Sequence, residues 1–123
     1  MNSFDLQCEF APTIENASAE HVLQGLHALG LQPEDPDDIS VSLFLNVVAS
    51  DDPMTSMQVS CLDDSQYEVE VQFGSLKERF VRKEATSLRE TRSILMDYIN
   101  QTFKFEQEKW NRLDLSHLEN ESN

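Results

Sequence analysis

The sequence predicts an α+β protein, with a mostly antiparallel sheet of about five strands and two helices packed on one face. Apolar residues recur at every second position in several short segments, which is the period of a half-buried strand, and at helical spacing in two longer segments. The expected order along the chain is β-α-β-β-β-β-α. At 123 residues, the chain is near the usual size of one domain. We expect a single domain over residues 1–118 and a frayed acidic tail over residues 119–123.

A strand and a helix are expected at the N-terminus. Apolar side chains alternate with polar ones in the first segment: Phe4, Leu6, Cys8 and Phe10. Pro12 ends this strand. Ser18 then fits the N-cap of a helix that stops at Gly30. The apolar face of this helix is expected to consist of Val22, Leu23, Leu26 and Leu29. Residues 33–38 form an acidic connector with turn chemistry.

Four more strands are expected in the middle of the chain. The segment from Ile39 to Val48 is apolar on both phases, which is typical of a central strand, and residues 51–53 form the turn after it. Residues 57–61 and 67–73 alternate cleanly. A three-residue loop, residues 63–65, would place Cys61 opposite Tyr67 and Val59 opposite Val69, so that apolar side chains share one face.

The next turn predicts a second register. Gly74-Ser75 fits a two-residue hairpin turn. This turn pairs Gln72 with Lys77, Val69 with Phe80, and Glu70 with Arg79, and the last pair is a cross-strand ion pair worth about 0.2–1 kcal/mol. We therefore expect Glu70 to be partly neutralised from within the protein.

The second helix opens at a capping box. Ser87-Leu88-Arg89-Glu90 matches this pattern, with Thr86 as a competing cap. Its apolar positions at helical spacing are Leu88, Ile94, Leu95, Tyr98, Ile99 and Phe103. Beyond Phe103 the apolar residues are more loosely spaced.

Charge is distributed unevenly along the chain. No Lys or Arg occurs in residues 1–76, which hold fourteen Asp and Glu residues, whereas nine basic and nine acidic residues follow from Lys77 onward. The formal charge of −14 therefore belongs to the N-terminal part. A one-sided acidic field speeds the capture of a cationic partner. Solubility is the alternative explanation of the carboxylates.

The sequence contains no recognisable catalytic or cofactor motif. Its three histidines, His21, His27 and His117, lack the i, i+4 spacing of a helical metal site. Glycine occurs only at positions 25, 30 and 74, so no phosphate-binding loop is expected. We expect Cys8 and Cys61 to be buried, reduced cysteines. A disulfide between them would require their two strands to be adjacent in the sheet. We expect a protein that is not an enzyme and that holds no cofactor or metal.

Location and partner class follow from the same features. The segment from Met1 to Asp5 has no basic or apolar character of a secretory signal, and no apolar run is long enough to span a membrane. Negative charge disfavours nucleic acid and anionic lipid. We therefore expect a cytoplasmic monomer or weak dimer that binds a basic protein and neither nucleic acid nor membrane.

The expected binding residues are carboxylates on the open sheet face and in the acidic loops. They are Asp5, Glu9, Asp51, Asp52, Asp63, Asp64 and Glu68. Glu70 is set aside because Arg79 is its expected partner. Tight binding also needs apolar anchors. Phe44, Phe105 and Trp110 are the candidates, although such residues more often belong to a core.

Residues 67–99 carry a family resemblance. The strand Tyr67–Gly74, a second strand through Phe80, and Ala85–Glu90 opening a helix that ends at residues 97–99 resemble the C-terminal half of small immunity proteins. These belong to bacterial polymorphic-toxin systems of contact-dependent inhibition or type VI secretion. The resemblance implies a cytosolic protein that blocks the active site or substrate groove of a basic toxin domain, such as a nuclease. It transfers no individual binding residue.

Two other classes remain open. Type III secretion chaperones are acidic α+β proteins of this size that hold an effector segment as homodimers, but they usually open with a helix. DNA-mimic inhibitors are also acidic, but their carboxylates extend along the whole molecule, whereas residues 77–123 are balanced here.

Overall fold

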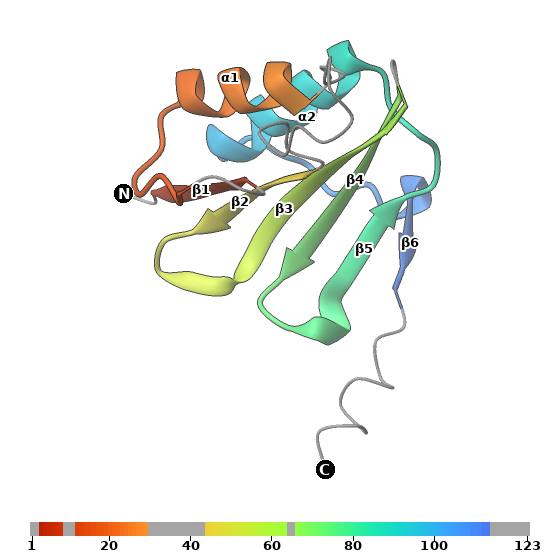
Figure 1. Cartoon of the computed structure of the whole chain (residues 1–123). Coiled ribbons are helices and arrows are strands. Elements are labelled where there is room, and N and C mark those ends of the chain that lie inside the picture. Colours follow the sequence, from red (N-terminus) through yellow and green to blue (C-terminus); the bar gives the residue numbers. More distant parts are fainter. Residues whose placement is uncertain (1–2, 9–11, 30–43, 64–65, 114–123) are drawn as a thin grey trace.

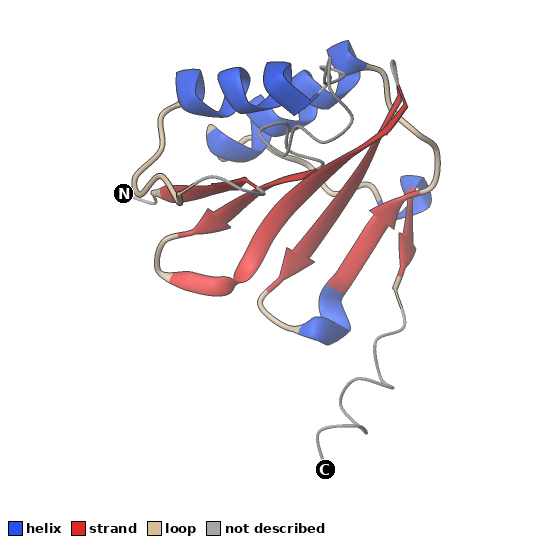
Figure 2. Ribbon diagram, in the orientation of Figure 1, coloured by secondary structure: helices blue, strands red, loops and turns tan. Residues whose placement is uncertain are grey.

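The described residues form a six-stranded antiparallel sheet with two α-helices on the same face (Figures 1 and 2). The computed structural model describes residues 3–8, 12–29, 44–63 and 66–113. The strands lie in the sheet in their order along the chain, so each one pairs with the next. The predicted α+β class is confirmed, and the order β-α-β-β-β-β-α gains one further strand at its end.

The strands are β1 Phe4–Cys8, β2 Phe44–Ala49, β3 Asp52–Asp63, β4 Gln66–Phe73, β5 Arg79–Arg82 and β6 Trp110–Arg112. The helices are α1 Ala19–Leu29 and α2 Leu88–Ile99, with short 3-10 turns η1 Leu76–Glu78 and η2 Gln107–Lys109. The bounds of β1, β4, α1 and α2 are close to those predicted from the sequence, whereas two other strands begin elsewhere. The third strand begins at Asp52, inside the turn predicted over residues 51–53, and the fifth begins at Arg79, after a 3-10 turn. The predicted connector over residues 33–38 and the predicted strand residues 39–43 lie outside the described residues.

Both predicted N-caps are confirmed. At α1, the Ser18 hydroxyl oxygen accepts the backbone N–H of His21 at 3.2 Å, and the Ser18 N–H donates to His21 Nδ1 at 3.0 Å. At α2, Ser87 Oγ accepts the backbone N–H of Glu90 at 3.1 Å. These bonds satisfy donors that the first helical turn would otherwise leave unpaired. Ser87, not Thr86, is therefore the cap of α2.

The core lies between the helices and one face of the sheet. Side chains that are at most 2% exposed include Leu6, Val22, Leu26, Leu45, Met57, Val59, Val69 and Leu95. On α2 the buried side chains are Thr91, Leu95 and Tyr98. Leu88, the first apolar position of the predicted helical pattern, is 44% exposed, and the buried stripe starts one turn later at Thr91.

The β3–β4 register is the predicted one, and the β4–β5 register differs. Cys61 pairs with Tyr67, and Val59 with Val69, as predicted. The predicted loop included Asp63, which instead belongs to β3 and pairs with Gln66 after an irregularity in the register. In the next hairpin Arg79 pairs with Gln72 instead of Glu70. The reason is η1, which adds residues to the turn and shifts the strand by two positions, leaving the same side chains on each face.

The predicted ion pair between Glu70 and Arg79 forms despite this shift, because the two residues are diagonal neighbours in the sheet. Arg79 donates through Nε to Glu70 Oε2 at 3.1 Å and also contacts the same oxygen through a terminal nitrogen. A third bond runs from Arg79 to Gln72 Oε1 at 2.9 Å. Diagonal neighbours in a sheet are within reach of a long side chain, so the pair forms without direct opposition.

The last strand and the cysteines complete the sheet. β6 pairs with β5 through Arg82 and Trp110, and Trp110 is 4% exposed in the core. Cys8 and Cys61 lie on β1 and β3, which flank β2, so they are not on adjacent strands. Neither cysteine forms a disulfide, and both are half-buried. Burial raises the pKa of the Cys8 thiol, which is the opposite of what an activated thiolate requires.

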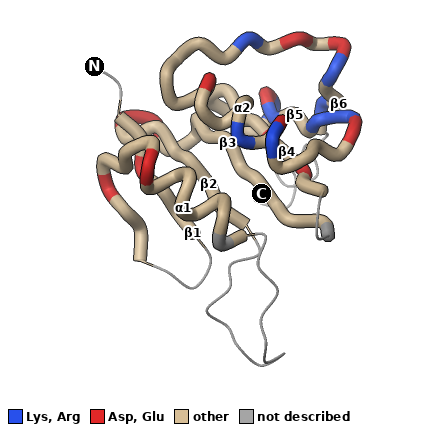
Figure 3. Tube along the Cα trace, turned by 90° about the horizontal axis from the view of Figure 1, so that it is seen from above, with Lys and Arg blue, Asp and Glu red and all other residues tan. Residues whose placement is uncertain are grey.

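The sequential strand order turns the uneven charge of the sequence into an uneven charge in space. In Figure 3 the Lys and Arg positions lie with α2, β5 and β6, whereas α1 and β1 contain Asp and Glu but no Lys or Arg. A fold with crossed strands would have mixed the two parts of the chain. The described part of the protein therefore has an acidic side and a side of mixed charge.

Candidate functional site

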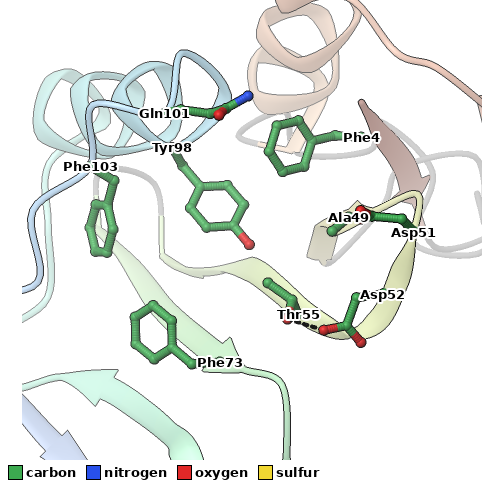
Figure 4. Close-up of a pocket in the computed structure, with 9 residues that line it drawn as sticks. All are labelled: Phe4, Ala49, Asp51, Asp52, Thr55, Phe73, Tyr98, Gln101 and Phe103. Carbon is green, nitrogen blue, oxygen red and sulfur yellow. Dashed lines mark hydrogen bonds between the residues drawn. The ribbon is translucent and has the colours of Figure 1, made fainter. Parts of the chain in front are cut away.

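A pocket of about 380 Å³ opens beyond the C-terminal end of α2, where several strand ends meet (Figure 4). The β2–β3 turn, the start of β1, the end of β4 and the segment after α2 contribute its walls. Its lining residues are Phe4, Ala49, Asp51, Asp52, Thr55, Phe73, Tyr98, Gln101 and Phe103. We call this the α2-end pocket. Its volume lies at the small end of the range for ligand sites.

Two carboxylates supply the charge of the α2-end pocket. Asp52 is held in place, because its Oδ1 accepts the Met54 N–H at 3.0 Å and its Oδ2 accepts the Thr55 hydroxyl at 2.6 Å. Asp51 is exposed in the turn beside it. None of the nine described lining residues is Lys or Arg. The pocket therefore has a negative electrostatic character that no cation in its own lining offsets.

Four aromatic rings form the apolar walls. The Tyr98 ring lies 5.3 Å from that of Phe4 and 6.0 Å from that of Phe103, measured between centroids. Phe73, at the end of β4, is 38% exposed. In Figure 4 the rings of Phe73 and Phe103 lie on one side of the Tyr98 ring, and Phe4 lies on the other. Such rings can bind cations through their negative faces.

Tyr98 has the most unusual environment in the pocket. Tyr98 is only 8% exposed, and its hydroxyl has no hydrogen-bond partner among the described residues. Figure 4 shows the hydroxyl directed toward the β2–β3 turn that carries Asp52. Burial and the charge of the Asp52 carboxylate raise the pKa of Tyr98 to about 12. The phenol therefore stays neutral at physiological pH, with a hydrogen-bond donor and acceptor unused.

The backbone at the rim is also unusual. Gln101 follows the Asn100 C-cap of α2 with a φ of 62°, a left-handed conformation that glycine normally adopts at this position. Its N–H donates to the Tyr98 carbonyl at 3.2 Å. A non-glycine residue costs about 1 kcal/mol or more here. The helix end nevertheless places a polar side chain at the pocket mouth.

This arrangement suits the binding of a cation better than catalysis. Because its pKa is raised, the Tyr98 phenol stays protonated at physiological pH and is a poor general base. Within the described residues, no group of three or more His, Cys, Asp or Glu side chains is placed to hold a metal ion. Carboxylates beside aromatic faces, by contrast, are the usual surroundings of a bound organic cation.

Asp5 was expected to be free for a partner, and the structure assigns it an internal role. Its Oδ1 accepts the Ser50 hydroxyl at 2.8 Å and the backbone N–H of Asn16 at 3.0 Å. These bonds tie the segment after β1 to the β2–β3 turn. Asp5 therefore supports the turn that presents Asp51 and Asp52.

The other predicted binding residues are separated from this turn. Glu68 lies half-buried on β4, opposite Ser60 and near the far end of the sheet. Asp63 ends β3, which starts at Asp52, so at about 3.3 Å per residue the two positions are roughly 35 Å apart. Glu9 and Asp64 lie outside the described residues. The structure thus brings Asp51 and Asp52 together and does not bring Glu68 or Asp63 to them.

Sequence reasoning missed the aromatic part of the α2-end pocket. Phe4 and Phe73 share the strand phase of core residues, and Tyr98 shares the helical phase of Leu95, so periodicity assigns all of them to the core. The predicted anchors lie elsewhere. Trp110 is in the core, Phe105 packs 4.7 Å from the Phe80 ring, and Phe44 is half-buried on β2.

No protein-family model, curated protein or solved structure matches this chain. In the described ranges, neither helix has the length and apolar character needed to cross a lipid bilayer.

Proposed function

We propose that this chain is a binding protein that neutralises a basic protein partner, as an immunity protein neutralises its toxin domain. The observation that carries the proposal is the α2-end pocket, whose two charged lining residues, Asp51 and Asp52, are both acidic and adjoin aromatic rings. The resemblance of residues 67–99 to small immunity proteins suggests the same class.

The physical basis is charge complementarity. An enzyme that acts on a polyanion such as a nucleic acid must present a cationic cleft to bind it. An acidic protein can fill that cleft by offering carboxylates where phosphates would lie. The acidic side of the described chain also attracts such a partner during diffusion, which raises the association rate at low ionic strength.

Co-expression with the product of the adjacent upstream gene tests the proposal. We expect that product to be toxic and the wild-type chain to restore growth. The double variant Asp51→Asn, Asp52→Asn should lose the rescue while keeping its circular dichroism spectrum. The matched control is Glu15→Gln with Glu20→Gln, which removes the same charge from exposed sites outside the pocket lining and should still rescue.

Other outcomes assign the chain elsewhere. Equal rescue by both double variants would place the binding surface outside the α2-end pocket. A non-toxic neighbour together with a stable homodimer that holds an effector segment would establish the chaperone alternative. Inhibition of several unrelated DNA-binding proteins would instead support the DNA-mimic class, because a cognate inhibitor recognises one partner.

A further inference from the structure

We infer that the α2-end pocket receives one guanidinium group, from an arginine side chain of the basic partner, against Asp52 and the ring of Tyr98. The inference rests on the proposed function and names the chemical group that the site recognises. It makes a single inserted arginine the anchor of the complex.

Two independent observations support a ligand at this position. The first is the pair of carboxylates without a cation in the described lining. Acidity alone also serves solubility, so it does not identify a site. The second is the Tyr98 hydroxyl, which is buried and has no partner among the described residues. Buried polar groups are nearly always hydrogen-bonded, and an orphaned one is a cost that a bound donor would remove.

The geometry of Asp52 suits a forked donor. Each carboxylate oxygen already accepts one bond, from the Met54 N–H and from the Thr55 hydroxyl, which fixes the orientation of the group. A carboxylate has about four acceptor sites, so one site on each oxygen remains. Guanidinium presents parallel N–H groups that match such a pair of oxygens. A remaining N–H can then donate to the Tyr98 hydroxyl oxygen.

The aromatic walls favour arginine over lysine. Guanidinium is planar and weakly hydrated, so it stacks on ring faces and loses less hydration than an ammonium group when it enters an apolar site. Phe73 is the exposed ring of the pocket and can cover one face of the inserted group. Asp51 at the rim adds a second negative charge close to the same point.

The binding test uses blocked amino acids, so that it does not depend on knowing the partner. N-acetyl-arginine methylamide, the lysine analogue and the citrulline analogue are titrated into the full ¹⁵N-labelled chain. Citrulline has nearly the shape of arginine without its charge. We expect amide shifts at residues 49–55 and 98–103, with arginine binding tightest and citrulline at least about tenfold weaker.

Variants then locate the bound group. Asp52→Asn should weaken arginine binding about tenfold, and Tyr98→Phe should weaken it roughly threefold to tenfold while the ring wall is retained. Glu15→Gln, at an exposed site outside the pocket lining, is the matched charge control and should bind like the wild type. Because the folded state of each variant is checked by its amide spectrum, loss of binding is separable from unfolding.

Several results would overturn the inference. These are equal binding of arginine and citrulline, shifts centred elsewhere, wild-type binding by Tyr98→Phe, or no saturable binding of the blocked arginine. Failure of the growth rescue with intact arginine binding would reject the proposed function and keep the pocket. Growth rescue that depends on Asp51 and Asp52, without selective binding of arginine, would support the proposed function and reject the arginine site.

Discussion

Replacing Tyr98 by Phe should make the free protein more stable. The substitution removes a buried hydroxyl that has no described partner and keeps the ring that packs against Phe4 and Phe103. An unsatisfied buried polar group costs about 1–3 kcal/mol. We expect a gain near the lower end, ~1 kcal/mol, because the ring edge must repack slightly. In a domain of this size that gain raises Tm by roughly 4 °C.

The assay is equilibrium unfolding in urea at neutral pH, followed by far-ultraviolet circular dichroism and by the fluorescence of the buried Trp110. Both probes should report the same midpoint shift with an unchanged m-value. The matched control is Thr86→Val, which removes a buried hydroxyl that does have partners. Thr86 Oγ1 lies 2.7 Å from Thr91 Oγ1 and 3.3 Å from the Tyr67 carbonyl oxygen.

Thr86→Val should therefore lower the free energy of unfolding by about 1–2 kcal/mol, the opposite sign to Tyr98→Phe. A loss of stability in Tyr98→Phe comparable to that of the control would refute the reasoning, since it would mean that the Tyr98 hydroxyl makes a hydrogen bond in solution. A gain combined with weaker arginine binding would identify Tyr98 as a residue kept for binding at a cost in stability.

Three further predictions concern local features. Gly25→Ala should stabilise the protein by about 0.5–1 kcal/mol, because an added Cβ meets its nearest neighbours at 3.6 Å, an ordinary contact, and alanine favours the helix; thermal unfolding measures it. Ser87→Ala should cost about 1 kcal/mol in urea unfolding, since the Glu90 N–H loses its acceptor, and an unchanged midpoint would show that the cap contributes nothing. In an alkaline absorbance titration of the folded protein, Tyr98 should ionise near pH 12, above its ordinary pKa of 10. The unfolded state loses this proton near pH 10 and the folded state only near pH 12, so the wild type should lose stability as the pH rises through that window and Tyr98→Phe should lose less.

The hairpins show what the sequence can and cannot predict about the sheet. Alternation fixes which side chains share a face, and it favours the register that places Cys61 opposite Tyr67, which the structure has. In the β4–β5 hairpin, by contrast, two registers that differ by two residues place the same side chains on each face of the sheet. Alternation cannot separate them, and only the turn conformation of η1 decides that Arg79 lies opposite Gln72.

The candidate site shows a second limit. Acidity alone identified Asp51 and Asp52, because charge is visible in any sequence. Periodicity predicts a core position for Phe73, because this residue continues the alternation of buried side chains along β4. In the fold, Phe73 is instead 38% exposed and lines the α2-end pocket together with residues that follow α2. That relation depends on how far a helix covers a sheet, which no periodicity reports.

The sequential order of the strands also has a consequence for how the protein folds and opens. Strands β3, β4 and β5 are joined by short turns, whereas β1 and β6 reach their neighbours through long connections that contain α1 and α2. Closing the longer loops costs more entropy, so we expect the outer strands to join late and to detach first. In hydrogen exchange, the amides of β3 and β4 should be the slowest and those of β1 faster. Because Phe4 on β1 forms one wall of the α2-end pocket, the detachment of a single edge strand would open the pocket while the central hairpin stays intact.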